Sequence, residues 1–500
     1  MVFESLEPKL VWEIFEEVFT KTPRESKKEN KIRSKLKSWI PERAKSHGIE
    51  IDVIEDEAGN LLFKKGPTKG MESTQPILLQ GHMDMVCETD RPDGFDFDNN
   101  PIPVRIQDNG EWVDADGTTL GGDNGIGSSL GLALLLDPEV RHGPLELLIT
   151  VDEETGLVGA FALDPEKIGI KSKLMVNVDS EELGVITIGS AGGGDTDLVK
   201  KIKRKEVTGN ATFYDLIVSG LAGGHSGVDI HKHRANANKL VGRVLSTIMA
   251  EMNVHLCNWN GGNKTNAITR EATAKFAVES VKSARTEELL KSAATDLKAY
   301  YKEIEPDIHI SWEKASAEPA FSLEESKKII QSINAMPHGP IRFSPNVEGL
   351  VETSNNVAVV KTDDSEVSVL LSSRSNVDSE LESFRQAITD LAELSGWEAT
   401  KKAIYPGWKP EPKNPFLAFV RKHFEEVTGR EVKIQAIHAG LECGIIGAKI
   451  PGIQMVSIGP RMENVHTPNE RLKIVDVEII YNLLKALVED LPNLKRLVLR

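Results

Sequence analysis

The chain has few cysteines, and their placement excludes a disulfide framework. Its 500 residues include three cysteines, Cys87, Cys257 and Cys443, which lie far apart and form no CxxC pair. An odd number of cysteines without paired spacing is typical of a protein that works in a reducing compartment. We therefore expect no disulfide-stabilised scaffold and no cysteine-rich metal site.

Long apolar runs are also missing. No run approaches the roughly 20 residues that a transmembrane helix requires. The first residues, Met1-Val2-Phe3-Glu4, show no basic stretch followed by an apolar one, which a secretory signal would have. These features predict a cytoplasmic protein with no membrane partner.

Positive charge is not in excess. The chain has 60 lysines and arginines against 76 acidic residues, a net charge of −16, which argues against a nucleic-acid binder or a ligand of anionic membranes. Two glycine-rich stretches, Gly121–Gly127 and Gly192–Gly194, invite comparison with nucleotide-binding loops. Neither has the GxGxxG or GxxxxGK[ST] pattern in its required context.

What the chain does contain is an ordinary globular composition, with 40% hydrophobic and 27% charged residues. Its length is too great for one core, so we expect at least two domains. Continuous apolar strands are predicted at 76–79, 145–151 and 174–178, with an apolar helix at 126–136. This alternation predicts an α/β domain with a mixed, largely parallel sheet and helices on both faces.

The pattern changes near residue 186, where Val185–Gly194 is predicted to form a strand followed by a glycine-rich loop. Residues 191–403 alternate half-buried strands with amphipathic helices, which predicts an inserted α+β domain. It is compatible with two βαββαβ units, although no repeat of individual residues is visible. From 414 onward the alternation of apolar strands and helices returns. Residues 1–190 and 404–500 are therefore predicted to form one discontinuous domain around the insertion 191–403.

Chemistry-bearing side chains gather at the predicted strand ends. Ligands of open α/β sheets bind beyond the carboxyl ends of the strands. Imidazole together with carboxylates is the donor set of a hydrolytic zinc or manganese site. The residues at these ends are His82 and Asp84, Asp123 in a glycine-rich turn, Glu153 and Glu154, Asp179, and His466 in a late loop.

Each of these residues alone is unremarkable, since a lone His-x-Asp arises by chance and acidic turns are usually solvated. As a set they match what two divalent metals about 3.5–4 Å apart require, including one bridging carboxylate. Asp84 can accept a hydrogen bond from His82 and fix its tautomer. In the pair Glu153-Glu154, one carboxylate can bind metal while the other acts as a general base.

Several motifs together resemble those of the co-catalytic zinc peptidases of the aminoacylase/carboxypeptidase superfamily. They are Gly81–Asp84, Gly121–Gly125, Asp152–Gly156, Val178–Ser180 and His466–Pro468. Two further stretches, Gly220–Gly227 and Ile437–Gly444, make the chain similar to the aminoacyl-histidine dipeptidases, also called cytosol non-specific dipeptidases. The resemblance extends over nearly the whole chain, in the family's order and spacing.

The resemblance implies a role for each matching residue. His82 and Asp179 would bind one metal, Glu154 and His466 the other, and Asp123 would bridge them. Glu153 would be the general base, and Asp84 would orient His82. In the inserted domain, acting as a lid, His225 would stabilise the oxyanion, while Arg374, accompanied by Asn266, would bind the substrate's carboxylate. A cis peptide bond between Asp123 and Asn124 is also implied.

The resemblance thus implies a dipeptidase with two divalent metals per subunit, acting on small unblocked dipeptides such as β-alanyl-histidine. Zinc is expected, with cobalt and manganese as alternatives. An N-acyl amino acid deacylase or a tripeptidase would use the same metal site. A non-catalytic binding protein would be favoured by the loss of Glu153 or a ligand, and none is lost.

Two questions stay open at the level of sequence. The chain is either a homodimer or uses a duplicated lid to supply in cis what a partner subunit would supply. His438, Glu442 and Cys443 either line the pocket or are structural.

Overall fold

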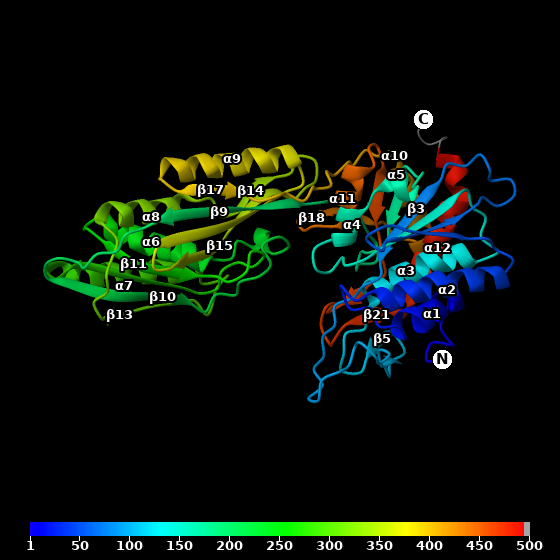
Figure 1. The fold of residues 1–500 in the computed structure, drawn as a ribbon, viewed down its shortest axis with the longest axis horizontal. Helices are drawn as coiled ribbons and strands as arrows, with labels where there is room; N and C mark the ends of the chain where they lie inside the picture. The colour runs from blue at the N-terminus through cyan, green and yellow to red at the C-terminus, as the bar shows by residue number, and fades with distance from the viewer. Residues whose placement is uncertain (495–500) are drawn as a thin grey trace. The chain divides into compact units, whose positions relative to one another are not determined.

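The computed structural model describes residues 1–494, which divide into two compact units (Figure 1). The first unit comprises Met1–Gly189, Pro410–Ala436 and the chain from Leu441 onward, and the second comprises Ser190–Lys409 and Ile437–Gly440. Within the described residues, no helix has the length and apolar character needed to cross a membrane.

The first unit contains an eight-stranded mixed sheet in the order β1-β2-β6-β3-β7-β19-β8-β18. Its strands are β1 (Asp52–Glu55), β2 (Leu61–Lys65), β3 (Ile77–His82), β6 (Leu145–Thr150), β7 (Leu174–Asn177), β8 (Val185–Ser190), β18 (Lys433–Ile437) and β19 (Gln454–Ser457). Parallel pairing joins the four strands β6, β3, β7 and β19. Every residue of β3, β6 and β7 is buried, as expected of strands covered on both faces.

Helices cover both faces of this sheet, which confirms the predicted α/β class. Figure 1 shows α1, α2 and α3 on one side of β3, and α4, α5 and α11 on the other. The helical segments are α1 (Lys9–Ile14), the π-helical η1 (Phe15–Thr20), α2 (Asn30–Ser46), α3 (Gly122–Leu136), α4 (Val158–Ala162), α5 (Pro165–Ile168), α10 (Pro415–Thr428), α11 (Glu442–Lys449), α12 (Ile474–Asp490) and the 3-10 turn η4 (Leu491–Asn493).

A small antiparallel sheet, not predicted from the sequence, accompanies the large one. Its order is β20-β21-β5-β4, with strands β4 (Val104–Ile106), β5 (Trp112–Ala115), β20 (Met462–Glu463) and β21 (Arg471–Lys473). Strands this short give little periodicity to detect. The hairpin β20–β21 matters for the site because the connecting residues include His466.

The second unit is built on a nine-stranded antiparallel sheet, with β13-β10-β12-β11-β15-β16-β9-β17 in order and β14 paired to β15. Its strands are β9 (Gly192–Lys201), β10 (Ala211–Ser219), β11 (His255–Gly261), β12 (Ala272–Glu279), β13 (His309–Ala315), β14 (Gly339–Phe343), β15 (Val351–Thr362), β16 (Glu366–Ser375) and β17 (Glu398–Lys401). Its helical segments are η2 (Ile230–Lys232), α6 (Ala237–Met249), η3 (Ser280–Lys282), α7 (Ser283–Tyr301), α8 (Leu323–Ala335) and α9 (Asp378–Leu394).

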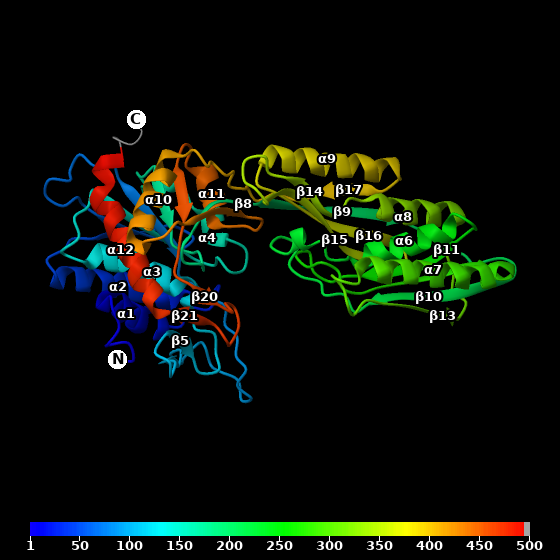
Figure 2. The ribbon, with the colours of Figure 1, turned by 180° about the vertical axis from the view of Figure 1, so that it is seen from behind.

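Two βαββαβ units are present in this sheet. In the first, β10-α6-β11-β12-α7-β13, the strands are arranged in space as β13-β10-β12-β11. In the second, β9-α8-β15-β16-α9-β17, the arrangement is β17-β9-β16-β15, which is the same order, and β14 is an addition. The units meet where β11 pairs with β15. Figure 2 shows α6, α7, α8 and α9 lying alongside the sheet, with which they share one apolar core.

One local prediction was wrong. Gly192–Gly194 does not form a loop but begins β9, where it pairs with Ser373–Ser375 of β16. Glycine is needed there because neighbouring groups approach closely. A Cβ on Gly192 would lie 2.5 Å from the nitrogen of Gly407, and one on Gly193 would lie 2.5 Å from the Tyr405 hydroxyl.

Candidate functional site

The first group of predicted ligands lies at the ends of two adjacent parallel strands. His82 is the last residue of β3, and Asp179 follows β7 by two residues. The pairing of Gln80 with Asn177 brings the two strand ends together. The His82 ring is 1% exposed, and its Nε2 lies 2.9 Å from Asp123 Oδ1 and 3.6 Å from Asp179 Oδ1.

Asp123 reaches this position because the start of α3 packs directly under the strands. The side chain of Asn124 accepts a hydrogen bond from the His82 backbone N–H (3.3 Å) and donates one to the Val178 carbonyl (2.6 Å). A Cβ on Gly127 would lie 1.9 Å from that same carbonyl oxygen, so only glycine permits the approach. The peptide bond between Asp123 and Asn124 is cis, as the family resemblance implied.

The second group contains Glu154 and His466, which meet on the other side of Asp123. His466 Nε2 lies 3.1 Å from Asp123 Oδ2 and 3.0 Å from Glu154 Oε2. Asp123 thus offers one oxygen to each histidine, which is the arrangement of a bridging carboxylate. All five predicted ligands come together in the first unit.

Asp84 lies behind His82, as expected of a residue that orients it. Its Oδ1 is 3.3 Å from His82 Nδ1, which leaves Nε2 to face the carboxylates. Asp84 also accepts hydrogen bonds from the backbone N–H groups of Glu153 (3.0 Å) and Glu154 (3.3 Å), and from the Ser26 hydroxyl (2.8 Å). One buried carboxylate therefore fixes both the imidazole and the turn after β6.

Glu153 differs from its neighbour Glu154 in having no partner. Within residues 1–494 its carboxylate makes no hydrogen bond or ion pair, whereas Glu154 contacts His466. Burial raises the pKa of Glu153, and the nearby carboxylates of Glu442, Glu154 and Asp123 raise it further, while His82 opposes them. A carboxylate that is unpaired and raised in pKa suits a proton acceptor.

The donor set fits divalent metal ions. His82, Asp123 and Glu154 each offer a ligand atom within 4.8 Å of the others. The buried Oδ1 of Asp179 has no hydrogen-bond partner among the described residues. Burial would lower the pKa of His82, but Asp179, Asp123 and Asp84 together raise it. Such an accumulation of carboxylates around two imidazoles is compensated by bound cations.

In the second unit, His225 is held in one tautomer. Its Nδ1 accepts the backbone N–H groups of Gly227 (3.1 Å) and Val228 (3.2 Å), so the ring proton is on Nε2. Burial lowers the pKa of His225, and the charge of Arg374 lowers it further. The ring is therefore neutral with Nε2–H as its donor, which suits hydrogen bonding to a developing oxyanion.

Arg374 lies within the same unit, near the end of β16. It is 8% exposed, yet no acidic side chain among residues 1–494 forms an ion pair with it. Its Nη1 donates to the Tyr405 hydroxyl at 2.7 Å, and its buried Nε has no partner. A buried guanidinium without a counter-ion is prepared for an anionic ligand. Asn266 is exposed, and its backbone carbonyl accepts the N–H of Ser226, the residue after His225, at 2.8 Å.

The three residues with open roles belong to different units. His438 is buried in the second unit, where its Nε2 lies 2.7 Å from the Ser354 hydroxyl. Glu442 is buried in the first unit and accepts hydrogen bonds from Gln80 (2.5 Å) and Thr150 (2.8 Å), below the ends of β3 and β6. Cys443 is fully buried, and burial raises the pKa of its thiol.

Two supporting residues were missed. Glu470 accepts backbone N–H groups from the loop that contains Asp123. The buried guanidinium of Arg24 donates to the carbonyls of Met83, Asp84 and Gly121. Each is far in sequence from the backbone that it binds, so no local motif could reveal it.

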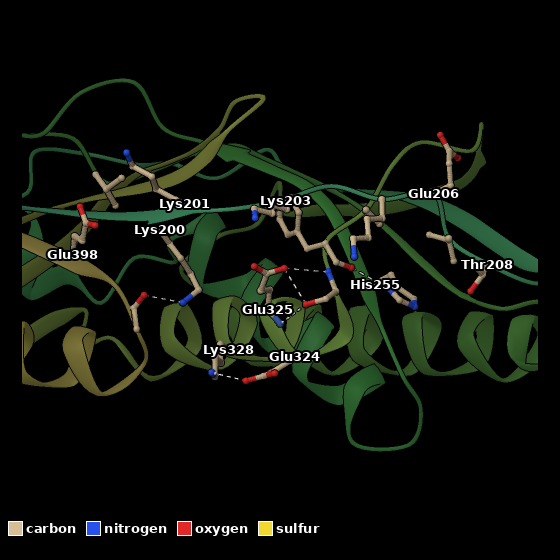
Figure 3. Close-up of a pocket in the computed structure, with 17 residues that line it drawn as sticks. Lys200, Lys201, Lys203, Glu206, Thr208, His255, Glu324, Glu325, Lys328 and Glu398 are labelled. Carbon is tan, nitrogen blue, oxygen red and sulfur yellow. Dashed lines mark hydrogen bonds and ion pairs between the residues drawn. The ribbon is translucent and has the colours of Figure 1, made fainter.

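A cavity of about 750 Å³ in the second unit contains none of the predicted site residues (Figure 3). Its charged groups are partly engaged within the protein. Lys200 donates to the carbonyls of Ser395 (3.1 Å) and Gly396 (2.8 Å), and Lys328 pairs with Glu324 at 2.7 Å. The cavity gives no reason to move the site away from the residues above.

Comparison with known proteins adds three findings. Residues 217–305 match the model of a peptidase dimerisation domain of the M20 type. The chain is 37% identical to the cytosol non-specific dipeptidase of Escherichia coli strain K12, over 98% of this chain and 99% of that protein. It is 38% identical to the crystal structure of an aminoacylhistidine dipeptidase from Vibrio alginolyticus, covering 97% of each chain with a TM-score of 0.89.

A more distant structure shares the fold alone. The aminopeptidase PepT from Bacillus cereus ATCC 10987 is 18% identical, with a TM-score of 0.54 and coverage of 97% of this chain and 99% of that one.

Proposed function

Since the chain belongs to the aminoacyl-histidine dipeptidases of the M20 metallopeptidase family, we propose that it is a metal-dependent dipeptidase that hydrolyses unblocked dipeptides, including Xaa-His dipeptides such as β-alanyl-histidine. One observation carries the proposal. Four candidate ligands, His82, Asp179, Glu154 and His466, gather around the fifth, Asp123. The unpaired carboxylate of Glu153 is close enough to feel the charges of His82, Glu154 and Asp123.

The proposed metal content is two divalent ions per subunit, with zinc as the expected metal and cobalt or manganese as alternatives. His82 and Asp179 would hold one ion, Glu154 and His466 the other, and Asp123 would be shared. When bound, the ions supply Lewis acidity, which lowers the pKa of water toward about 7 and polarises a carbonyl group. Nitrogen and oxygen donors of this kind support zinc without excluding the other two metals.

The chain's own residues would then move the protons. Glu153 accepts the proton of the attacking water and returns it to the leaving amine. Asp84 keeps Nε2 of His82 directed toward the carboxylates, because its Oδ1 faces Nδ1 at 3.3 Å. His225 donates from Nε2–H to the oxyanion that develops on the scissile carbonyl.

Substrate selection would come from the second unit, acting as a lid. We propose that Arg374 binds the free C-terminal carboxylate of the substrate, with Asn266 nearby. Catalysis would require the lid to close over the first unit. The lid proposed from the sequence is residues 191–403, and the compact second unit comprises Ser190–Lys409 and Ile437–Gly440. A closed lid that demands a carboxylate favours dipeptides over longer peptides.

The alternatives share the metal site but lack a specific observation in their favour. A deacylase would accept a blocked amino group, and a tripeptidase would accept a longer substrate. The retained Glu153 and complete ligand set give no support to a non-catalytic role.

We also propose a cytoplasmic location, supported by the name of the Escherichia coli relative. The match of residues 217–305 to a dimerisation domain supports a homodimer. The pairing of β11 with β15 supports the alternative, in which the duplicated lid replaces a partner. Light scattering of the purified protein decides between them.

The proposal is tested by comparing the wild type with Glu153→Gln on a panel of unblocked dipeptides. The variant keeps the size of the side chain and removes its basicity. We expect hydrolysis to fall by about 10²- to 10⁴-fold, the usual contribution of a general base, while metal content is unchanged. Equal rates for both proteins would contradict the assigned role, and a wild type that cleaves no dipeptide would contradict the function.

A further inference from the structure

The two proposed metal positions are supported by different parts of the fold. The first uses His82 and Asp179, which are fixed by paired strands of the buried sheet. The second uses His466, whose side chain is 46% exposed, in the hairpin between β20 and β21. Burial therefore holds the His82 ring in place, whereas the His466 ring needs another constraint.

Glu470 lies at the base of that hairpin, four residues after His466. Its side chain is buried, and its backbone N–H donates to the Thr467 carbonyl at 3.0 Å, which forms a turn at the end of the hairpin loop. The carboxylate points away from this loop toward another segment of the first unit. That segment is Leu120–Asp123, which delivers the bridging aspartate.

The carboxylate of Glu470 binds four successive backbone N–H groups. Oε2 accepts from Leu120 (2.9 Å) and Gly121 (3.0 Å). Oε1 accepts from Gly122 (2.8 Å) and Asp123 (3.3 Å). Gly121 has a φ of 70°, a conformation that favours glycine and lets the chain curl around the carboxylate. One side chain thus accepts hydrogen bonds from all four backbone N–H groups of this turn.

Arg24 holds the same turn from the opposite side. Its buried guanidinium donates to the Gly121 carbonyl and, at 3.1 and 2.8 Å, to the carbonyls of Met83 and Asp84 just beyond β3. Hydrogen bonds of Arg24 therefore connect the turn to the sheet, and those of Glu470 connect it to the His466 hairpin. Only the bonds of Glu470 link Asp123 to the segment that carries His466, a ligand of the second metal position.

We propose that Glu470 is a positioning residue that holds His466 and Asp123 at the separation required by the second metal ion, and so sets the affinity of that position separately from the first. The inference rests on the proposed dinuclear function. It goes beyond that function because it assigns the affinity of the first metal position to the sheet and the affinity of the second to the hairpin. Loss of Glu470 should weaken metal binding at the position of Glu154 and His466 more than at the position of His82 and Asp179.

The test is a titration of metal-free protein with cobalt(II), followed by its visible absorption and by metal analysis after dialysis. In Glu470→Gln the amide –NH₂ would face backbone N–H groups, so two of the four hydrogen bonds would be replaced by opposed donors. We expect the first equivalent to bind as in the wild type and the second to bind about 10- to 100-fold more weakly, as for other residues that orient metal ligands.

A matched control is Glu146→Gln. Glu146 is a second buried carboxylate of the first unit, and it accepts backbone N–H groups from Lys171 (3.1 Å) and Ser172 (3.0 Å) at the opposite end of β6 from Glu153. It should lower stability in a urea titration without changing either cobalt equivalent. If Glu470→Gln does not fold, Glu470→Asp, which keeps the charge but shortens the reach, carries the same comparison.

Steady-state kinetics give a second readout. With limiting metal, kcat of Glu470→Gln on β-alanyl-histidine should fall with occupancy of the second position, and excess metal should restore it to within a few-fold of the wild type. The inference would be overturned if Glu470→Gln bound both cobalt equivalents as tightly as the wild type, or bound both more weakly to the same degree. It would also be overturned if Glu146→Gln bound the second equivalent as weakly as Glu470→Gln. If the wild type binds two ions but cleaves no dipeptide, the proposed function fails, while the cobalt titration still decides the role of Glu470.

Discussion

Replacement of Arg374 by methionine tests how the substrate is selected. Methionine retains an unbranched apolar stem in β16 and removes the guanidinium. The loss would be felt because Arg374 is buried, has no acidic partner in the described chain, and donates only to Tyr405. The free carboxylate of a dipeptide would then face no positive charge from this position.

The size of the effect follows from the bonds lost. A hydrogen bond to a charged group contributes about 1.5–3 kcal/mol, so the two bonds of a bidentate pair should contribute about 3–6 kcal/mol. This corresponds to a fall of about 10²- to 10⁴-fold in kcat/KM. Arg374→Lys, which keeps the charge but not the planar fork, should lose less, about 10-fold.

The assay compares β-alanyl-histidine with its C-terminal amide, which is neutral at that end. The wild type should strongly prefer the acid, and Arg374→Met should cleave the two compounds at nearly equal rates. Tyr405→Phe is the control, because it removes only the hydroxyl that contacts Arg374 at 2.7 Å, and it should keep the preference. An equal loss on both substrates would refute the assignment, since the guanidinium would then not be recognising the carboxylate.

Three further predictions follow from the geometry of the two units. His225→Ala should lower kcat by about 10²- to 10³-fold with a small change in KM, since its Nε2–H would act mainly on the transition state; a change confined to KM would argue against this. Asp84→Asn should weaken metal binding by about 10- to 100-fold in an equilibrium dialysis measurement, because the amide no longer fixes the His82 tautomer; unchanged binding would remove Asp84 from the site. Chelation of the metals should lower the thermal unfolding temperature, because ions that bind only the folded state stabilise it; an unchanged temperature in calorimetry would contradict a built metal site.

The predictable part of this protein is the part that the sheet organises. His82, Glu154 and Asp179 were placed together from sequence because parallel strands present their carboxyl ends at one edge. The continuous apolar runs of β3, β6 and β7 predict those strands. The family resemblance then supplied roles that spacing alone left open, and the cis peptide bond after Asp123 agreed with it.

The unpredictable part depends on contacts between distant segments. Glu470 binds backbone groups about 350 positions earlier in the chain, and its side-chain type carries no hint of that turn. The role of Arg24 is hidden in the same way, because a charged residue near a predicted helix is ordinarily solvated. Gly192–Gly194 forms a strand where the sequence predicts a loop, because its glycines allow close packing against Tyr405 and Gly407.

We propose that the five candidate ligands and Glu153 form a metal-dependent dipeptidase site. The most direct measurement is the rate at which metal-free protein, reconstituted with zinc, cobalt or manganese, cleaves β-alanyl-histidine and N-acetyl-histidine. We expect rapid, metal-dependent cleavage of the unblocked dipeptide, reaching its maximum at two equivalents of metal, and little action on the acetylated compound. Turnover of N-acetyl-histidine alone, or no hydrolysis with two ions bound, would contradict it.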